Sequence, residues 1–373
     1  MNLTLSEEQK LIKDSAIKYL ELNYSFDKRR EMIDENPLHY LKHWKGFADL
    51  GWLGLPFPEK VGGFGGNVSN LMTLMECLGA NLTLEPYIFN NLIVGKILQS
   101  FPSNKTAKYL AEIITGDKLY TFLFSPTDNY KSNILRISNN KSESKANLLT
   151  GYINCVFGLE KFDFILVPVL VDEYLSLYLI GQDQKGFEIK NYETIDNMKC
   201  SNIEFSELNL EESELITKTK KDNFFNKFDY IFDLATLSIC SQALGIIDKM
   251  YDLTLEYSKT RNQFGKNIGA FQVVQHRLVD MYIIKEEMRS LNYMAQVTID
   301  KEKDVRKKNI SLNKIFLSSR AKFMSQDCIQ LHGGMGVAKE MSIGHYFSKI
   351  TAFSTLFGSI DYHRERYAAT DVN

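Results

Sequence analysis

The amino-acid sequence predicts an α+β protein in which a helical segment, a β segment and a second helical segment follow one another. Three observations predict this order. Helical patterns dominate residues 1–117, short apolar runs separated by turn-forming residues fill residues 118–221, and long apolar stripes of helical period return over residues 222–373. We therefore expect three domains with these boundaries, and a chain of 373 residues is long enough to give them a large buried core.

The first segment opens with a helix-start signal. The Ser6 side chain can accept a hydrogen bond from the backbone N–H of Gln9, and the Gln9 side chain can reach back to Ser6, so the pair fits a capping box. Residues 56–66 are rich in glycine but lack the spacing of a phosphate-binding P-loop. We expect this stretch to be a tight loop between helices.

The second segment carries strand signals. Its apolar runs at residues 120–124, 164–169 and 175–180 are short and are separated by Asn, Asp, Lys and Gly. This pattern predicts a small antiparallel barrel or sandwich. The polar stretch 138–145 is expected to be an exposed hairpin loop.

The third segment has long stripes of apolar residues at helical spacing. One stripe steps by three and four residues, which places its members on one helix face: Cys240, Leu244, Ile247, Tyr251 and Leu255. Long amphipathic helices of this kind are typical of an antiparallel bundle.

Composition and charge exclude several classes of partner. The net charge is only −2 and the charges are interspersed, so no nucleic-acid partner is expected. The first residues lack the features of a secretory signal, and no stretch approaches the roughly 18 uninterrupted apolar residues of a transmembrane helix, so no membrane association is expected. The five widely spaced cysteines suit a reducing compartment, which predicts a cytoplasmic location. His39 and His43 have no evident third ligand, so no metal site is predicted.

Two motifs in the third segment carry chemistry. Residues 261–265 read Arg-Asn-Gln-Phe-Gly, and an arginine fork placed just after a helix matches the oxygens of a phosphate. Residues 330–336 read Gln-Leu-His-Gly-Gly-Met-Gly, and glycines without side chains allow a backbone to approach a ligand closely. Both features suit a dinucleotide with its pyrophosphate.

These motifs resemble the Arg-x-Gln-Phe-Gly and Gln-x-x-Gly-Gly-x-Gly signatures of the acyl-CoA dehydrogenase family, and the similarity extends over nearly the whole chain. The resemblance implies an N-terminal helical domain, a middle β-barrel or sandwich domain and a C-terminal four-helix bundle. It also implies an FAD-dependent oxidoreductase of fatty acid metabolism that catalyses α,β-desaturation of an acyl-CoA thioester, with an electron-transfer flavoprotein as acceptor. Because these motifs reach the FAD of a neighbouring subunit in this family, an oligomer is implied.

The same resemblance gives particular residues expected roles. Asp233 is expected to contact the CoA of the substrate, as an Asp at this place does in relatives. The residues expected to bind FAD are Arg261, Gln263, Phe264, Phe271, Gln272, Gln330, Gly333, Gly334 and Ser359.

The tail of the chain is similar to one bacterial branch of the family. The stretch Glu85-Pro86-Tyr87 is similar to this branch, which acts on bulky or long acyl-CoAs, and residues 357–366 resemble its small-subunit members. Those members typically work beside a larger homologue, which carries the catalytic base, in an α2β2 flavoprotein. The resemblance therefore implies either a homo-oligomer or an α2β2 heterotetramer with a Glu-bearing homologue.

The usual catalytic base is missing. In the family an aromatic-Glu-Gly-Thr stretch supplies the glutamate that removes the substrate's α-proton, but here that position holds Phe357, which cannot accept a proton. A minority of the family places its glutamate at a position that corresponds to Ala235, followed here by Thr236. Asp361 is a candidate substitute base, because a short helical turn would bring it onto the same face as Phe357. Its alternative role is structural.

The β segment also departs from the family pattern. The stretch that cradles the flavin and the thioester has become residues 124–130, and the Trp-Ile-Thr segment that shields the flavin ring appears as residues 151–155 without a tryptophan. Three functions stay open. The first is an FAD-dependent acyl-CoA dehydrogenase family subunit that lacks the usual base. The second is an oxygen-using flavoenzyme on the same scaffold, and the third is a non-catalytic FAD-binding subunit.

Overall fold

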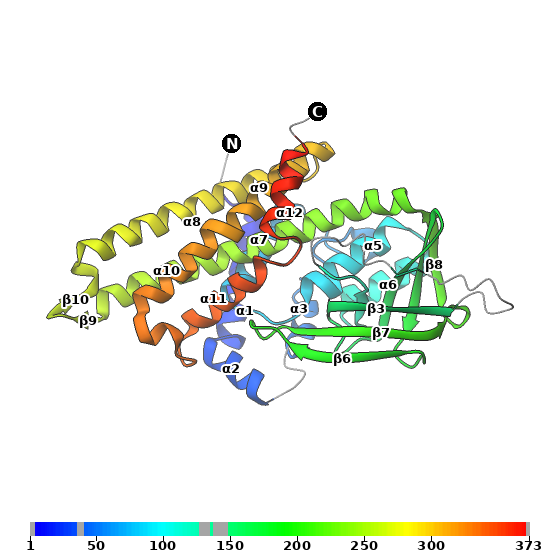
Figure 1. Ribbon diagram of the computed structural model, residues 1–373, viewed down its shortest axis with the longest axis horizontal. Coiled ribbons are helices and arrows are strands. Elements are labelled where there is room, and N and C mark those ends of the chain that lie inside the picture. The colour runs from blue at the N-terminus through cyan, green and yellow to red at the C-terminus, as the bar shows by residue number, and fades with distance from the viewer. Residues whose placement is uncertain (1–3, 36–40, 127–134, 137–147, 371–373) are drawn as a thin grey trace. The chain divides into compact units, whose positions relative to one another are not determined.

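The computed structural model describes residues 4–35, 41–126, 135–136 and 148–370, and it contains helices at both ends of the chain and strands between them (Figure 1). The predicted α+β class is therefore confirmed. The contacts divide the chain into two compact units, one of Met1–Asn36, Asn67–Thr83 and Thr236–Asn373, the other of Pro37–Gly66 and Leu84–Ala235. Among the described residues the strands lie between Tyr120 and Lys220, except for the short strands β9 (Asn262–Gln263) and β10 (Lys266–Asn267), while the three-domain division stays a prediction.

The first unit is helical, and its first helix begins as the sequence predicted. The Ser6 side chain accepts from Gln9 N at 3.2 Å, while Gln9 Oε1 accepts from Ser6 N at 2.9 Å. The helices that lie wholly in this unit are α1 (Glu7–Asn23), α2 (Phe26–Glu35), α4 (Val68–Ala80), α8 (Gln272–Thr298), α9 (Lys303–Phe316), α10 (Lys322–His332), α11 (Ser342–Phe353) and α12 (Ile360–Ala368). The part of α7 (Lys221–Thr260) that follows Ala235 also belongs to it.

Helix α7 is the core helix of this bundle. Cys240, Leu244 and Ile247 of the predicted stripe are fully buried, as the spacing indicated, whereas Tyr251 and Leu255 are half-buried. Among the described helices, α7 alone is long and apolar enough to cross a membrane, but 94% of its most apolar window is buried inside the protein. Such burial is typical of a core helix, and it explains the apolar composition.

Helices α4 and α7 meet backbone to backbone. A Cβ on Gly79 would lie 2.0 Å from the carbonyl oxygen of Gln242, and a Cβ on Gly245 would lie 2.0 Å from that of Glu76. Each helix therefore places a glycine against the main chain of the other, and any larger side chain there would push the helices apart.

The second unit contains the β structure, in two sheets. Strands β1 (Tyr120–Phe122), β4 (Phe164–Val171), β5 (Tyr174–Gly181) and β8 (Glu214–Lys220) lie in that order in the larger sheet, with β2 (Leu135–Arg136) also paired to β4. The smaller sheet has the order β3 (Leu148–Phe157), β7 (Lys199–Asn209), β6 (Phe187–Glu193). Strands of both sheets contribute to one apolar core that includes Ile153, Ile165, Val167, Ile203 and Phe205. The predicted sandwich is therefore present.

The expectation of a purely antiparallel arrangement is wrong, because β1 and β2 both pair with β4 in parallel. The predicted hairpin loop at 138–145 lies outside the described residues. The remaining helices of this unit, besides the first part of α7, are α3 (Trp44–Asp49), α5 (Val94–Ser100) and α6 (Asn104–Thr115), with a π-helical turn at Tyr87–Ile93. The glycine-rich stretch 56–66 is a loop, as predicted, with a short 3-10 turn at Glu59–Val61.

Candidate active site

The arginine motif forms a hairpin at the end of α7. Strands β9 (Asn262–Gln263) and β10 (Lys266–Asn267) pair antiparallel, and the two residues between them, Phe264 and Gly265, have φ angles of +54° and +80°. Two residues of positive φ make the tight turn that suits a two-residue hairpin. The Asn267 side chain donates to Lys259 O at 2.6 Å and Ile268 N donates to Arg261 O at 2.9 Å, so the hairpin is anchored to α7.

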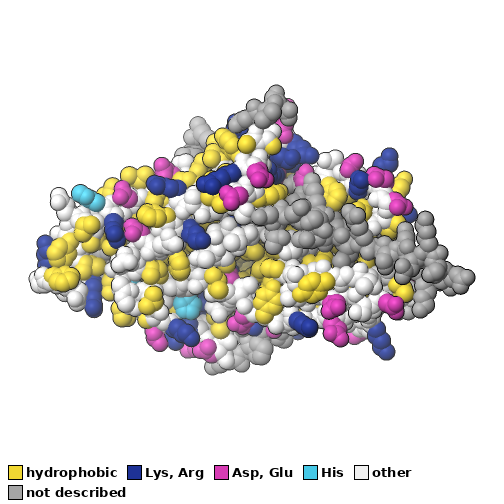
Figure 2. Space-filling view, viewed as in Figure 1, with side chains coloured by type: hydrophobic (Ala, Val, Ile, Leu, Met, Phe, Trp, Pro, Cys, Tyr) yellow, Lys and Arg dark blue, Asp and Glu magenta, His cyan; other side chains and the backbone are white. Residues whose placement is uncertain are grey.

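The side chains of this hairpin lie on the surface. Arg261 and Gln263 are exposed, and Phe264 at the tip is 91% exposed. Phe271 lies 6.2 Å from Phe264 in an edge-on arrangement, and Lys266 Nζ lies 4.3 Å above the Phe271 ring. Figure 2 shows hydrophobic side chains among charged ones at the left, over the end of the molecule where Figure 1 places β9 and β10. The hairpin thus offers an arginine and an aromatic ring to a ligand or a second chain.

The glycine motif follows α10. Gly333 has a φ of +59°, which L residues with a side chain rarely adopt, and a short 3-10 turn runs over Gly333–Val337. A Cβ built on Gly333 or on Gly334 would have no neighbour within 4 Å, so both face open space. Gln330 is exposed one helical turn earlier. This bare backbone beside exposed polar groups fits the close approach of a dinucleotide.

The structure brings the two motifs together. The Tyr257 ring, four residues before Arg261, stacks on His332 with ring centroids 4.4 Å apart, and the Tyr257 hydroxyl donates to His332 O at 3.4 Å. Burial lowers the pKa of His332, whose Nδ1 lies 2.9 Å from Cys328 O. A neutral His332 therefore packs against α7 immediately before Gly333. A groove of about 610 Å³, lined by residues that include Tyr251, Tyr282 and Gly269, adjoins the hairpin.

The position of the usual base lies in the loop between α11 and α12. Phe357 is fully buried and has a φ of +55°. His363 Nε2 lies 2.8 Å from Phe357 O, and His363 Nδ1 lies 3.2 Å from Ser311 Oγ. Burial lowers the pKa of His363 well below its usual value, and the charge of Lys314 lowers it further. The neutral ring can therefore donate from Nε2 and accept at Nδ1, which fixes the main chain at Phe357.

Asp361 lies in a different environment from Phe357. Its side chain is 78% exposed and pairs with Arg364 at 3.3 Å in the first turn of α12, where a negative charge stabilises the helix. Gly358, with a φ of +103°, and Ser359, the N-cap of α12, separate it from Phe357. The geometry disfavours Asp361 as the base and agrees with the structural alternative. The Ser359 hydroxyl accepts from Tyr362 N at 3.3 Å, so its local role is helix capping.

The second unit contains the other expected site residues. Asp233 and Ala235 on α7 are fully buried. The expected contact between Asp233 and CoA stays a prediction. Of the stretch 124–130, residues 127–130 lie outside the described residues, while residues 151–155 form part of β3. His39 also lies outside the described residues, and the described residues contain no cluster of metal-binding type.

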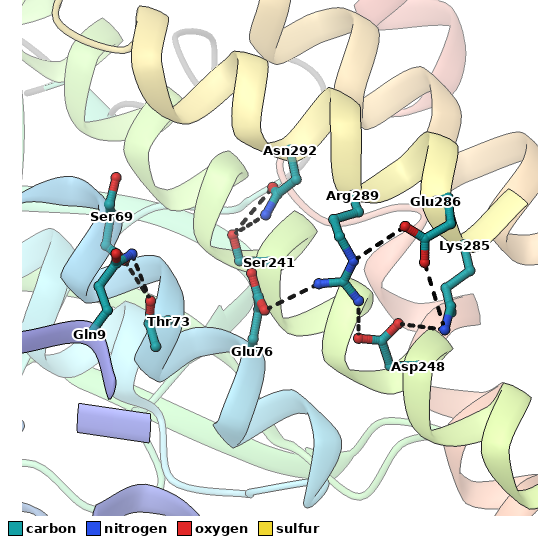
Figure 3. Close-up of polar contacts among 10 residues, drawn as sticks. All are labelled: Gln9, Ser69, Thr73, Glu76, Ser241, Asp248, Lys285, Glu286, Arg289 and Asn292. Atoms are coloured by element: carbon teal, nitrogen blue, oxygen red, sulfur yellow. Dashed lines mark hydrogen bonds and ion pairs between the residues drawn. The ribbon is translucent and has the colours of Figure 1, made fainter. Parts of the chain in front are cut away.

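Sequence reasoning missed a charged network across α4, α7 and α8 (Figure 3). Arg289 pairs with Asp248, and Arg289 Nη1 lies 4.0 Å from Glu76 Oε2. Lys285 Nζ lies 3.9 Å from Asp248 Oδ1 and 3.7 Å from Glu286 Oε1. Burial raises the pKa of Glu76 to about 7, and the Asp248 charge adds to this rise while Arg289 opposes it. The network lies beside a cavity of about 340 Å³. Because its members come from three distant segments, no local pattern would have revealed it.

The raised pKa of Glu76 predicts a pH-dependent stability. Below pH 4.5 this carboxyl is protonated in both the folded and the unfolded protein, and its contribution to stability is fully present. As the pH rises to about 7, only the unfolded chain releases the proton, so the free energy of unfolding falls. In the parent protein we expect this fall in the free energy of unfolding to be on the order of 1–3 kcal/mol between pH 5 and pH 8. Glu76→Gln should abolish the fall, and urea unfolding at the two pH values measures it. Glu286→Gln, at a 43% exposed partner of Arg289, is the matched control. If the free energies of unfolding of the parent and of Glu76→Gln differed by the same amount at both pH values, the raised pKa of Glu76 would be contradicted.

Comparison with known proteins supports the sequence resemblance. The model of the acyl-CoA dehydrogenase N-terminal domain matches residues 6–117, and that of the C-terminal domain matches residues 225–370. The caffeyl-CoA reductase-Etf complex subunit CarC of Acetobacterium woodii is 23% identical over 367 residues, which cover 95% of each chain. Among solved structures, the ChsE4-ChsE5 complex from Mycobacterium tuberculosis has a TM-score of 0.85 at 20% identity, with 100% of this chain and 99% of that chain covered.

A second solved structure, PigA with FAD and proline, has a TM-score of 0.87 at 21% identity and covers 100% of this chain and 99% of that one. At such identities the structural likeness shows the fold, while the two domain models, which together match more than half of the sequence, show the family. The resemblance that the motifs at 261–265 and 330–336 carried is thereby confirmed. The chain belongs to the acyl-CoA dehydrogenase family, whose members are FAD-dependent oxidoreductases that act on the CH–CH bond of acyl-CoA thioesters.

Proposed function

We propose that this chain binds FAD and takes part in the α,β-desaturation of an acyl-CoA as a subunit that lacks its own catalytic base. The observation that carries the proposal is Phe357, which occupies the usual position of the base, is fully buried and is fixed through its backbone by His363. A phenyl ring cannot take up the α-proton. The glutamate then belongs to the active site of a partner.

The proposed FAD site combines the two surface motifs. The Arg261 guanidinium suits the pyrophosphate, because a planar, permanently charged fork donates two parallel hydrogen bonds to phosphate oxygens. Gly333 and Gly334 admit the ligand close to the backbone, and the side chains proposed to line the remainder are Gln263, Phe264, Phe271, Gln272 and Gln330. When bound, FAD supplies the acceptor for the hydride from the substrate's β-carbon.

The exposure of these groups supports a shared site. Arg261 and Gln263 lie on an outer hairpin, and Phe264 at its tip leaves 91% of its surface in solvent. A second subunit that covers the hairpin would bury the Phe264 ring and complete the dinucleotide site. We propose a homo-oligomer or an α2β2 heterotetramer with a Glu-bearing homologue. The relatives include a subunit of an Etf complex and a ChsE4-ChsE5 complex, which supports a partner subunit and an electron-transfer flavoprotein as acceptor. A cytoplasmic location is part of this proposal.

An oxygen-using flavoenzyme is the second candidate, and the buried Phe357 in place of the base favours it. The CoA contact expected of Asp233 argues against it. Oxygen chemistry at a reduced flavin needs no α-proton base, so Phe357 would be no obstacle to it. A subunit that only holds FAD is the remaining possibility.

An anaerobic flavin titration separates these functions. The purified chain is mixed with a panel of acyl-CoAs, alone and after co-purification with a Glu-bearing homologue, and the absorbance of the oxidised flavin is followed. We expect no bleaching of the chain alone and bleaching of the complex. Bleaching of the chain alone would overturn the partner requirement. If neither bleaches, admission of oxygen to the chemically reduced protein with candidate substrates separates an oxygenase, which forms product, from a subunit that only holds FAD.

A further inference from the structure

Two cysteines of the smaller sheet face each other across neighbouring strands. Cys155 Sγ on β3 and Cys200 Sγ on β7 are 3.6 Å apart, although 45 residues separate them in the sequence. We propose that Cys155 and Cys200 are a modification site, at which a peroxide converts the two thiols into a reversible disulfide within the chain.

The backbone is arranged to bring the two sulfur atoms together. Val156 pairs with Ser201 and Phe157 with Cys200, and the register shifts between Ile153 and Val156. Cys155 lies within this irregularity and has a φ of +57°, a conformation that residues with side chains rarely adopt. Its N–H donates to the Asn202 side chain at 3.1 Å instead of to a strand partner. The bulge therefore turns the Cys155 side chain away from the regular alternation of the strand.

The two thiols differ in exposure. Cys155 is half-buried and can be reached from solvent, whereas Cys200 is fully buried. Tyr192 lies opposite Cys200 on β6, and its hydroxyl oxygen, on a side chain that is 41% exposed, is 3.4 Å from Cys200 Sγ. Cys155 is thus the thiol that meets an oxidant first, and Cys200 is the thiol behind it.

The hydrogen bond between the thiols favours the same order. The Cys200 thiol donates to Cys155, which lowers the pKa of Cys155 to about 7, and the Tyr192 hydroxyl contributes in the same direction. That hydrogen bond and burial raise the pKa of Cys200. The thiolate is the reactive form of cysteine, so Cys155 is the nucleophile and Cys200 is the resolving thiol.

The reaction balances with hydrogen peroxide as the oxidant. The Cys155 thiolate attacks one peroxide oxygen, the O–O bond breaks, and hydroxide leaves and takes up a proton, which gives Cys155 sulfenic acid. The Cys200 sulfur then attacks the Cys155 sulfur, the S–O bond breaks, and water leaves with the Cys200 proton. Each sulfur is oxidised by one electron, and the peroxide is reduced by two electrons to water.

The other three cysteines provide internal controls. Cys77, Cys240 and Cys328 are buried, and burial raises the pKa of each to about 12. They should stay reduced under conditions that oxidise the pair. They also give the expected stoichiometry, since two of the five thiols of the chain should disappear together.

The test uses the whole chain in its native state. The protein is treated with a small excess of hydrogen peroxide, quenched and unfolded, its free thiols are alkylated, and its peptides are mapped by mass spectrometry. We expect the loss of two thiols, a cross-link between the peptides that contain Cys155 and Cys200, and recovery of both thiols with dithiothreitol. Five free thiols after oxidation, or cross-links between chains instead of within one, would overturn the proposal.

Variants separate the two roles. Cys155→Ser should abolish the cross-link, Cys200→Ser should leave Cys155 as a sulfenic acid that a dimedone probe traps, and Cys77→Ser should cross-link normally. If a serine variant fails to fold, the alkylation rates of the parent chain at pH 7 still decide the outcome. Cys155 should react about tenfold or more faster than Cys77, because the hydrogen bond from Cys200 lowers the pKa of Cys155 whereas burial raises that of Cys77. Equal rates would refute the assignment of Cys155 as the nucleophile.

Discussion

Replacement of Phe357 by glutamate is expected to raise the rate of flavin reduction by an acyl-CoA by about 10²- to 10⁴-fold, the usual contribution of a positioned general base. The backbone at this position is fixed by His363, so a new carboxyl group would start from a defined place. Burial would raise the pKa of that carboxyl towards neutrality, which suits a base that works near pH 7. Stopped-flow measurement of flavin bleaching under anaerobic conditions gives the rate.

Two control variants make this result specific. Phe357→Gln has nearly the size of the glutamate but no basic oxygen, and it should stay inactive. Asp361→Asn should leave any activity unchanged, because Asp361 is exposed and paired with Arg364. If Phe357→Glu binds flavin and remains inactive with every acyl-CoA, the substrate pocket itself has diverged, and the oxygen-using function gains support.

Replacement of Arg261 by alanine is expected to weaken FAD binding by about 10- to 150-fold. Hydrogen bonds to a charged group contribute about 1.5–3 kcal/mol, and about 1.4 kcal/mol corresponds to a tenfold change in Kd. The effect should appear as a lower flavin content after purification and as a higher Kd when the apoprotein is titrated with FAD. The Kd for FAD should also depend less on salt concentration, because one charge pair with the pyrophosphate is lost.

Lys259→Ala is the matched control for the loss of Arg261. Lys259 is a cation two residues earlier, 60% exposed, and lies 3.8 Å from Glu256 in a surface ion pair. Surface pairs of this kind contribute little to stability, and the side chain is not part of the proposed site. A full flavin content in Arg261→Ala, or an equal loss in Lys259→Ala, would remove the pyrophosphate assignment.

The order of helical and β segments could be predicted because the apolar period is a local property. The capping box at Ser6 and the buried face at Cys240, Leu244 and Ile247 followed from spacing alone. The direction of strand pairing could not be predicted in this way. Alternation shows which residues face the core, but it does not say whether β1 runs parallel to β4.

For the candidate base Asp361, a local rule was extended across a break in the helix. The spacing of four residues between Phe357 and Asp361 suggested a helical turn, but Gly358 with its positive φ and the cap at Ser359 interrupt the helix. The expected CoA contact of Asp233 follows from the resemblance, and no local pattern shows that this side chain is fully buried. The pair Cys155 and Cys200 depends on the register of β3 and β7, which a single sequence does not contain.

The close crossing of α4 and α7 has a consequence for the synthesis of the chain. The apolar side chains of α4 include Leu71, Met72, Leu74 and Met75, and they emerge from the ribosome long before α7, since Met75 and its partner Gln242 are 167 residues apart. At roughly 5–20 residues per second, that delay is about 10–30 s. During this interval α1 can pack against α4, as it does in the folded protein, but the side of α4 that meets α7 stays uncovered. Production in a heterologous host should depend on chaperones that bind nascent chains and should improve when translation is slowed by cooling.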